Sequence, residues 1–507
     1  MALSDEIARL EAPAGASLNA YKALPPATVE RLLERAGWRP SGPPLLPHQM
    51  VGVLAGLRRS RLLFRYEQGL GKTKLLLDLF AVQRIRSPGL RGMVLGPSAT
   101  TTFDWVAEAK RHRPELRVIA CPEDPVEKRD VFLPKFLEGD DWDLVCLDYF
   151  SVQTLFSERR GNRYFPCAAA LAAAAARVGW AALDEIHLAR GRNTLRVELV
   201  HELLRNTTYR YGATGTLFNR TPEEVWGQAA LLDGGEALGH TLTAFRTLYC
   251  RQVPNRWTRF TYDFNPDRSA AFLARLSTLV LSYSLHETVQ LPGLHQERPT
   301  LQMTAEQQQF YRASLAEAVR LRRNGEVAAV WIKLRRILSG FTSTDPPAPL
   351  SASPKLEWLK RHVVPSSEPW VVFYEYTESG RGVVEYLEGA GKRVVWLYSG
   401  AKDRQALRKR WERGEVDVMV VQNSVGAQAL NLQRSRRLVF FEAPCSAITR
   451  SQAERRIYRI GQDREAYIYD LFFAGTVEAA VVQRTLDGMS LHQALLSTAR
   501  QATIARA

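Results

Sequence analysis

The sequence predicts an α/β protein of two lobes, each built on a parallel β-sheet and joined by a helical insertion. Two blocks of the chain, one beginning at residue 45 and one near residue 370, alternate apolar strand-like runs with helical stretches. Such alternation is typical of parallel sheets covered by helices on both faces. Between the blocks the alternation stops and arginine and aromatic residues become frequent. A chain of 507 residues is also too long for one core.

Strands are expected where short apolar runs occur. The first block has such runs at 61–64, 92–95, 117–120, 144–147, 180–183 and 209–213, and the second at 370–373, 393–397, 416–421, 438–441 and 466–472. Helical patterns occur around residues 5–11 and 27–36 and after residue 485. We therefore predict a lead-in (1–44), a first lobe (45–236), a helical, basic insertion and linker (237–352), a second lobe (353–488) and a helical tail (489–507).

The chain is strongly basic. Its 68 lysine and arginine residues exceed the 53 aspartate and glutamate residues, and the net charge is +15. This charge favours a polyanionic partner, with nucleic acid ahead of an anionic membrane, although a genome biased toward arginine codons would also produce it. The five cysteines are scattered and lack Cys-x-x-Cys spacing. We expect no disulfide framework and no zinc site, and a reducing compartment.

The sequence also bears on the compartment in which the protein is expected. The sequence shows no signal peptide, and its most apolar run, residues 167–176, is too short to span a bilayer. We therefore expect an intracellular protein of the cytoplasm or nucleoid that does not bind a membrane. Its size and arginine bias fit a bacterial or viral origin.

The first strand leads into a phosphate-binding loop. Residues 65–75 read Arg-Tyr-Glu-Gln-Gly-Leu-Gly-Lys-Thr-Lys-Leu, a glycine-bearing turn between a strand and a helix. Backbone N–H groups of such a turn, and the positive end of the helix dipole, face phosphate oxygens. Lys72 would reach the β- and γ-phosphates of ATP and Thr73 would ligate Mg²⁺. The usual opening glycine is replaced by Tyr66. The candidate ATP-binding residues of the loop are Gln68, Gly69, Leu70, Gly71, Lys72, Thr73 and Lys74.

Two adjacent carboxylates end a later strand of the first block. Asp184 and Glu185 follow the apolar run 180–183. In a phosphate-loop ATPase, Asp184 would hold Mg²⁺ through water and Glu185 would orient and deprotonate the attacking water. An acidic pair at this place is otherwise common as a helix N-terminus.

The second block carries a basic segment, residues 452–462, that reads Gln-Ala-Glu-Arg-Arg-Ile-Tyr-Arg-Ile-Gly-Gln. Arg456 and Arg459 are three residues apart and would share one face of a helix. Two such arginines are suited to stabilise the charge that develops on a γ-phosphate during hydrolysis. A solvated basic helix would have the same spacing.

Taken in order, these segments resemble the motor of superfamily 2 helicases, and specifically the Swi/Snf-type helicase-like ATPases that translocate on double-stranded DNA. The resemblance runs from about residue 45 to 490. It includes a Q motif (46–49), motif I without an opening glycine (67–73), motif Ia (94–105), the segment 147–149, and motifs II (184–187), III (214–216), IV (371–376), V (426–432) and VI (452–462). It implies two RecA-like lobes, with ATP and Mg²⁺ as cofactors and double-stranded DNA as partner.

The resemblance also implies individual roles. Gln49 would sense adenine, and Gln452 would join the catalytic set. Thr214, Gly215 and Thr216 would couple hydrolysis to movement. The residues implied to contact the DNA backbone are Ser98, Trp105, Tyr149, Ser424 and Asn431. Trp105 has the composition of a core residue as well, and the arginines of 320–336 would either track the duplex or form a solvated helix face.

The sequence departs from the family pattern in three places. Leu217 replaces a proline after motif III, Ala427 and Ala429 replace glycines of motif V, and residues 282–284 stand where the family has two arginines. Since the catalytic residue types are intact, we expect an ATP-driven translocase on double-stranded DNA. The alternatives are a strand-separating DNA or RNA helicase and a nucleic-acid-binding scaffold with a vestigial ATPase. With no recognition domain apparent beside the motor, targeting would come from a protein partner or from DNA structure.

Overall fold

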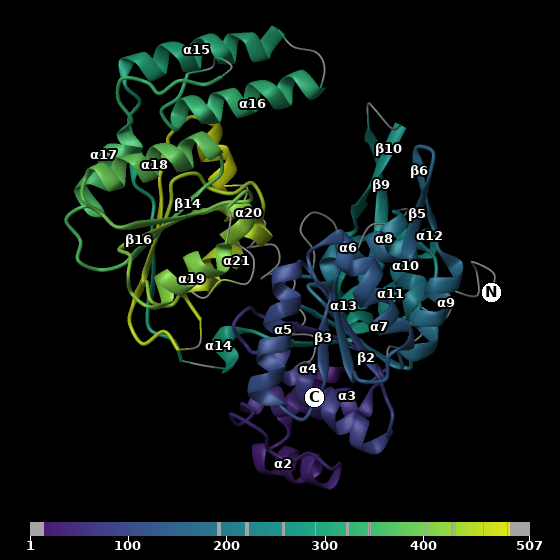
Figure 1. Ribbon diagram of the computed structural model, residues 1–507. Coiled ribbons are helices and arrows are strands. Elements are labelled where there is room, and N and C mark those ends of the chain that lie inside the picture. Colours follow the sequence, from purple (N-terminus) through teal and green to yellow (C-terminus); the bar gives the residue numbers. More distant parts are fainter. Residues whose placement is uncertain are drawn as a thin grey trace. The chain divides into compact units, whose positions relative to one another are not determined.

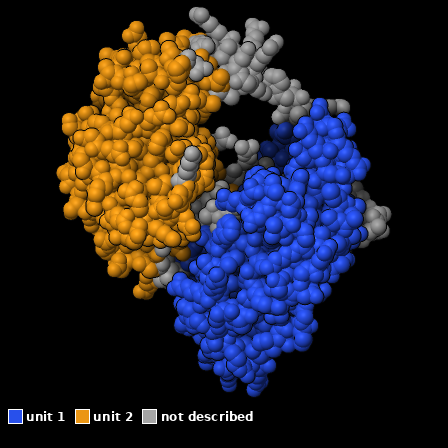
Figure 2. All heavy atoms as spheres, in the orientation of Figure 1, with its two compact units in different colours: residues 1–289, 492–507 blue, residues 290–491 orange. Residues whose placement is uncertain are grey.

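A computed structural model of the chain describes residues 15–486, except 190–193, 218–222, 256–258, 289, 321–323, 343, 345, 402, 427–429, 431, 460 and 484. The chain divides into two units, residues 1–289 with 492–507 and residues 290–491 (Figure 2). The expected helix around residues 5–11 and the tail 489–507 lie outside the described residues.

The first unit is built on a seven-stranded parallel sheet with the order β11-β1-β8-β7-β2-β4-β3 (Figure 1). Its strands are β1 (Arg61–Tyr66), β2 (Gly92–Gly96), β3 (Val118–Ala120), β4 (Leu144–Asp148), β7 (Trp180–Asp184), β8 (Tyr209–Thr214) and β11 (Val280–Tyr283). All except β11 coincide with a predicted strand to within two residues. The central strands are apolar throughout because helices cover both faces of the sheet.

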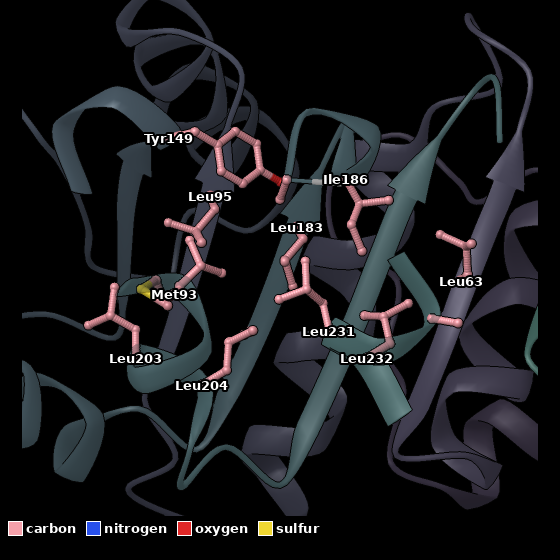
Figure 3. Packing of buried hydrophobic residues seen from close by; sticks show 14 of the residues in the cluster. Leu63, Met93, Leu95, Tyr149, Leu183, Ile186, Leu203, Leu204, Leu231 and Leu232 are labelled. Atoms are coloured by element: carbon pink, nitrogen blue, oxygen red, sulfur yellow. The ribbon is translucent and has the colours of Figure 1, made fainter. Parts of the chain in front are cut away.

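The helices of the first unit connect these strands. They are η1 (Leu18–Ala23), α2 (Pro26–Arg35), α3 (Pro47–Arg58), α4 (Lys72–Arg86), α5 (Ala99–His112), α6 (Pro125–Glu127), η2 (Lys128–Phe132), α7 (Leu133–Glu138), α8 (Tyr149–Phe156), α9 (Ala168–Arg177), η3 (Ile186–Ala189), α10 (Leu195–Leu204), α11 (Glu223–Asp233), α12 (Leu242–Tyr249), η4 (Pro266–Arg268), α13 (Ser269–Leu276) and α14 (Leu285–Thr288). Part of the core on one face of the sheet is shown in Figure 3. It contains Leu63, Met93, Leu95, Leu183, Leu203, Leu204, Leu231 and Leu232.

Two β-hairpins of the first unit form separate two-stranded sheets. One consists of β5 (Ser157–Arg160) and β6 (Arg163–Pro166), and the other of β9 (Cys250–Asn255) and β10 (Arg259–Phe264). Both are antiparallel. The sequence reading predicted neither hairpin.

The second unit is built on a six-stranded parallel sheet with the order β12-β18-β17-β14-β16-β15. Its strands are β12 (Leu294–Glu297), β14 (Trp370–Tyr374), β15 (Val394–Leu397), β16 (Val418–Gln422), β17 (Arg437–Phe440) and β18 (Ala466–Asp470), and β13 (Thr300–Leu301) pairs with β19 (Phe472–Phe473). Its helices are α15 (Ala305–Arg320), α16 (Asn324–Leu338), α17 (Pro354–His362), α18 (Thr377–Gly389), α19 (Arg404–Glu412), α20 (Asn423–Gly426) and α21 (Ala447–Ile457). The predicted fold class, α/β with two parallel sheets as in RecA-like lobes, is confirmed.

The stretch 237–352 is mixed and not helical as predicted. It contains strands β9 to β13 beside its helices, and the division between the units falls within it. β11 lies at one edge of the first sheet and β12 at one edge of the second. Both have four residues and pair with a single neighbour, so tertiary pairing, which sequence periodicity does not show, determines them.

Two further observations bear on the sequence analysis. None of the described helices is long and apolar enough to cross a membrane. The five cysteines all lie among the described residues, and none forms a disulfide.

Candidate active site

The turn between β1 and α4 has the backbone of an anion-binding loop. Gly69 and Gly71 have φ angles of 88° and 68°, in the left-handed region where a side chain is disfavoured. Gly71 is the N-cap of α4, and no side chain caps the helix there. The first N–H groups of α4, beginning at Lys72, therefore remain available to a phosphate group.

Gln49 and His48 of α3 hold this turn in place. The Gln49 amide nitrogen donates to the carbonyl oxygens of Leu70, at 3.1 Å, and Gly71, at 3.3 Å. Its amide oxygen accepts from the backbone of Leu46 at 2.8 Å. His48 Nε2 lies 3.0 Å from the Leu70 carbonyl oxygen, and burial lowers the pKa of this histidine. A Cβ atom at position 71 would lie 2.2 Å from the Gln49 nitrogen and would displace that side chain, and the left-handed φ of 68° independently favours glycine.

Tyr66, which replaces the usual opening glycine, lies in the sheet and not in the turn. It is the last residue of β1 and is fully buried. Its hydroxyl donates to the His48 carbonyl at 2.8 Å, and its ring makes edge contacts with Phe64 and Tyr283. Lys72 Nζ donates to the Tyr66 carbonyl oxygen at 3.1 Å. The replacement therefore leaves the glycine-bearing part of the turn intact.

Asp184, at the end of β7, is a half-buried carboxylate with two defined donors. One oxygen accepts the Glu185 N–H at 3.0 Å and the other accepts the Trp105 indole N–H at 3.2 Å. Burial and then the charge of Glu185 raise the pKa of Asp184 to about 6, while the nearby Lys72 opposes this rise. A bound cation would favour its ionised form. Carboxylate and hydroxyl oxygens, such as those of Asp184 and Thr73, are ligands that Mg²⁺ prefers, so the residues fit this ion.

Residues of motif III lie against the second carboxylate. The Thr214 hydroxyl is 3.3 Å from a Glu185 carboxylate oxygen and 3.1 Å from His187 Nδ1. It also accepts the Thr216 N–H at 3.1 Å. Glu185 itself has a φ of 47°, which is uncommon for a residue with a side chain. Thr214 is fully buried, and its one hydroxyl hydrogen has two acceptors within reach, the Thr216 carbonyl at 2.8 Å and the Glu185 carboxylate.

Gly215 packs closely against the loop. A Cβ atom at this position would lie 3.1 Å from the Gln68 side chain. The fold thus brings motifs I, II and III together within the first unit.

Trp105 and Tyr149, implied as DNA contacts, are 2% and 1% exposed. The Tyr149 hydroxyl donates to the Asp184 carbonyl at 3.1 Å, so both side chains direct their polar atoms at this residue. Sequence reasoning missed this, because Trp105 is separated from Asp184 by 79 positions and nothing in the motif spacing relates them.

The other implied DNA contacts differ among themselves. Ser98 caps α5 and is half-buried, and Ser424 is exposed on α20. Asn431 lies outside the described residues, as do Ala427 and Ala429 of motif V.

Lys74, a candidate loop residue, contacts a buried acid. Its ammonium group lies 3.2 Å from an Asp78 carboxylate oxygen. Asp78 is fully buried and also accepts from Trp38, at 2.8 Å, and from Arg113. In this structure the Lys74 ammonium group therefore lies on a structural carboxylate of α4.

The structure shows the contacts of two residues that depart from the family pattern, Leu217 and Ser282. Leu217 is 3% exposed and belongs to the core of the first unit, and its carbonyl accepts from the Gln228 amide. Ser282, in the edge strand β11, accepts from Arg65 at 3.2 Å. Leu217 therefore fills apolar space.

In the second unit, Arg456 and Arg459 do not share a helix face as predicted. α21 ends at Ile457, so Arg456 lies in its last turn and Arg459 follows the helix. The chain leaves the helix at Tyr458, whose φ of −105° and ψ of 86° are not helical. Gln452 lies on α21 and is half-buried, as are both arginines.

Two buried side chains fix the ends of this segment. Arg450 makes paired hydrogen bonds of 2.6 and 2.7 Å with the Asp470 carboxylate, which ties α21 to β18. The two hydrogens of the Gln462 amide nitrogen are shared among the carbonyl oxygens of Ile457, Gln433 and Ser435, which lie 3.1–3.3 Å from it. Gln462 therefore holds the end of the turn that follows α21.

The second unit also contains a buried ion pair. Lys355 is fully buried, and its ammonium nitrogen lies 2.5 Å from a carboxylate oxygen of Glu478. The Tyr311 hydroxyl accepts the Val477 N–H at 3.0 Å. Burial raises the pKa of Glu478. Residues far apart in the sequence thus form one buried cluster.

Comparisons with known proteins find distant relatives. No protein-family model matches the chain. The ISWI chromatin-remodeling complex ATPase CHR17 of Arabidopsis thaliana is 21% identical over 462 residues, 86% of this chain and 40% of that protein. YwqA of Bacillus subtilis, named as an ATP-dependent helicase/translocase, is 20% identical over 470 residues, 86% of this chain and 47% of that protein. The chain thus spans less than half the length of these relatives.

A solved structure is also similar. The SWI2/SNF2 ATPase core of Sulfolobus solfataricus in complex with double-stranded DNA is 18% identical, with a TM-score of 0.40, over 91% of this chain and 94% of that chain. The curated relatives align over most of the chain, in which the family motifs occur in order. Over 86% of its length the chain is therefore similar to chromatin-remodeling and helicase/translocase ATPases such as these.

Proposed function

We propose that the protein hydrolyses ATP to move along double-stranded DNA without sequence specificity. The observation that carries this proposal is the meeting of three motifs at the ends of neighbouring strands. β1, β8 and β7 are adjacent in the sheet, and they lead into the phosphate loop, Thr214 and Asp184 respectively. The carboxyl ends of parallel strands are where α/β proteins bind ligands.

Each group of the first unit has a role that follows from its chemistry. Lys72 would exchange the Tyr66 carbonyl for the β- and γ-phosphates, and the N–H groups of the loop would bind the same oxygens. Mg²⁺, when bound, would neutralise phosphate charge, with Thr73 and Asp184 as its protein ligands. Glu185, held by Thr214, would take the proton of the attacking water. Gln49 would bind adenine.

The second unit would complete the reaction. Arg456 and Arg459, with Gln452 nearby in the sequence, would stabilise the negative charge that develops on the γ-phosphate. Hydrolysis would then change how the two units hold the DNA backbone, as in other domain-closure cycles.

DNA binding would act mainly through phosphates. Ser98, Ser424 and Asn431 are the proposed backbone contacts, and binding would weaken steeply with salt. α5 carries Ser98 at its N-cap and, farther along, Trp105 on Asp184. We propose that Trp105, with Tyr149, acts through Asp184, so that a duplex bound at the start of α5 stimulates hydrolysis. Work on DNA would place the protein in the cytoplasm or nucleoid, where a protein partner would direct it to its sites.

ATP hydrolysis with different nucleic acids tests the proposal. The rate would be measured without nucleic acid and with single-stranded DNA, duplex DNA and duplex RNA, using Lys72→Ala as the blank. Stimulation mainly by duplex DNA is the expected result. Equal stimulation by single strands or RNA would favour a strand-separating helicase. A rate no higher than the Lys72→Ala blank under every condition would leave a nucleic-acid-binding scaffold.

A further inference from the structure

The two hairpins of the first unit have no part in the proposed ATPase site. In Figure 1, β5–β6 and β9–β10 extend from the same end of the unit. Isolated two-stranded sheets bury little surface and are marginally stable in water. Their side chains are correspondingly accessible, and these include three of the large exposed aromatic residues of the unit, Tyr164, Phe165 and Phe260.

The β9–β10 hairpin carries a row of aromatic rings on one face. Phe260, Tyr262 and Phe264 alternate along β10, and alternate residues of a strand point to the same side. Phe264 packs against the core of the unit, whereas Phe260 is 38% exposed. The rings of Phe260 and Tyr262 make an edge contact with centroids 5.6 Å apart. The row therefore runs from the core out to an exposed ring.

An arginine accompanies this row. The guanidinium carbon of Arg246 lies 4.2 Å from the Tyr262 ring centroid, and the guanidinium group is held by Glu223 through hydrogen bonds of 2.6 and 3.1 Å. A ring that already packs against a fixed guanidinium loses little side-chain freedom when a ligand stacks beside it. The Phe260–Tyr262 pair is thus pre-organised.

The β5–β6 hairpin exposes aromatic rings on both of its faces. Tyr164 and Phe165 are adjacent in β6, so they point to opposite sides, and they are 50% and 41% exposed. Tyr164 is directly opposite Arg159 in the ladder. The guanidinium carbon of Arg160 lies 5.8 Å from the Phe165 ring centroid. Each face therefore combines an exposed ring with an arginine.

The composition of both hairpins selects the kind of partner. Residues 157–166 and 250–264 each contain three arginines against one acidic residue. Arginines attract phosphate groups, and exposed rings stack on the faces of nucleobases. An acidic protein surface would satisfy the arginines but not the flat, exposed rings. In an intact duplex the base faces are stacked on each other, so only unpaired nucleotides offer them.

We propose that the β5–β6 and β9–β10 hairpins form a binding surface for unpaired nucleotides. This inference rests on the proposed function, and it adds that the protein recognises a single-stranded segment in addition to the duplex that it moves along. Arg159 and Arg160 would contact phosphates, while Tyr164, Phe165 and Phe260 would stack on bases. DNA and RNA share this chemistry.

Fluorescence anisotropy with defined oligonucleotides tests the surface. The probes are a blunt DNA duplex, the same duplex with a single-stranded DNA tail or an RNA tail, and each tail alone. The variants are Phe260→Ala and Tyr164→Ala, with Val126→Ala as the control, since Val126 is an exposed apolar residue outside both hairpins. Loss of one base stack corresponds to roughly a five-fold or greater loss of affinity.

We expect the unmodified protein to bind a tailed duplex more tightly than the blunt one. Each hairpin variant should lose about five-fold or more of its affinity for the tailed probe and retain its affinity for the blunt probe, whereas Val126→Ala should match the unmodified protein. The ranking of DNA and RNA tails identifies which nucleic acid the surface takes. Fluorescence of 2-aminopurine in the tail, quenched when the base stacks on a ring, should be less quenched with both hairpin variants.

Three results would overturn the inference. They are equal affinity for tailed and blunt duplexes, unchanged affinities in both hairpin variants, and equal losses on tailed and blunt probes, which would indicate a general duplex surface. Duplex-stimulated ATP hydrolysis separates these results from failure of the proposed function. If it persists in the unmodified protein and in the variants, the function stands while the hairpin surface is refuted.

Discussion

Replacing Trp105 by phenylalanine removes the indole N–H that donates to Asp184 at 3.2 Å and keeps an aromatic ring in the buried site. The lost partner is a carboxylate, and hydrogen bonds to charged groups contribute about 1.5–3 kcal/mol. Asp184 would keep the Glu185 N–H as a donor, but its other oxygen would lose its donor in a half-buried place. Weaker stabilisation of the ionised carboxylate lets protons compete with Mg²⁺ for it, so at a pH below the pKa of Asp184 the affinity for Mg²⁺ should fall by roughly 10-fold to 150-fold.

The assay is duplex-stimulated ATP hydrolysis as a function of Mg²⁺ concentration. Trp142→Phe is the matched control, because Trp142 is also fully buried in the first unit and its indole N–H has no hydrogen-bond partner among the residues that the structure describes. Both variants lose similar volume, so thermal unfolding should shift by similar amounts. Only Trp105→Phe should require more Mg²⁺. If the two variants have the same Mg²⁺ dependence, the indole does not position the carboxylate and the reasoning is refuted.

Three other substitutions follow from the geometry. Gly71→Ala places a Cβ 2.2 Å from the Gln49 amide nitrogen at a φ of 68°, so ATP binding measured by calorimetry should be lost; unchanged affinity would show that the loop tolerates another shape. Arg450→Met leaves the Asp470 carboxylate buried without its partner, so the free energy of unfolding of the second unit should fall by about 3–5 kcal/mol. Denaturant unfolding measures this change, and an unshifted midpoint would contradict it. Burial lowers the pKa of His48, so the unfolded chain binds a proton more readily, and stability should fall as pH drops below about 6.5. In thermal unfolding between pH 7.5 and 5.5, the stability of His48→Gln should depend less steeply on pH than that of the unmodified protein. An unchanged pH dependence would exclude His48 as a cause of the loss of stability.

The sequence allowed the two sheets and the phosphate loop to be predicted because local chemistry determines them. Apolar runs of strand length predicted five strands of the second sheet. The glycine pattern around Gly71 predicted a tight turn, because glycine readily adopts the positive φ that this backbone has. The edge strands β11 and β12 escaped prediction because four residues carry little periodicity, and their pairing is decided by the sheet that they join.

The candidate site shows the same division between local and distant information. The residue types of motifs I and II can be recognised in the sequence. The donor that Trp105 provides to Asp184, however, arises only when α5 packs on β2, β3 and β4 of the sheet. Likewise, the three-residue spacing of Arg456 and Arg459 suggested a shared helix face, but the helix ends between them, at Ile457. Spacing predicts a helix face only where the helix continues.

The two amide hydrogens of Gln49 are both engaged with the turn, one on each of two consecutive carbonyl groups. An amide nitrogen has no third hydrogen to offer. If this side chain donates a hydrogen bond to adenine, it must release a carbonyl of the turn when the base binds. Recognition of the base would then alter the shape of the backbone that receives the phosphates. A triphosphate with a different base would bind while Gln49 still holds both carbonyl groups of the turn. Selectivity for adenine would then appear in the rate of hydrolysis as well as in affinity.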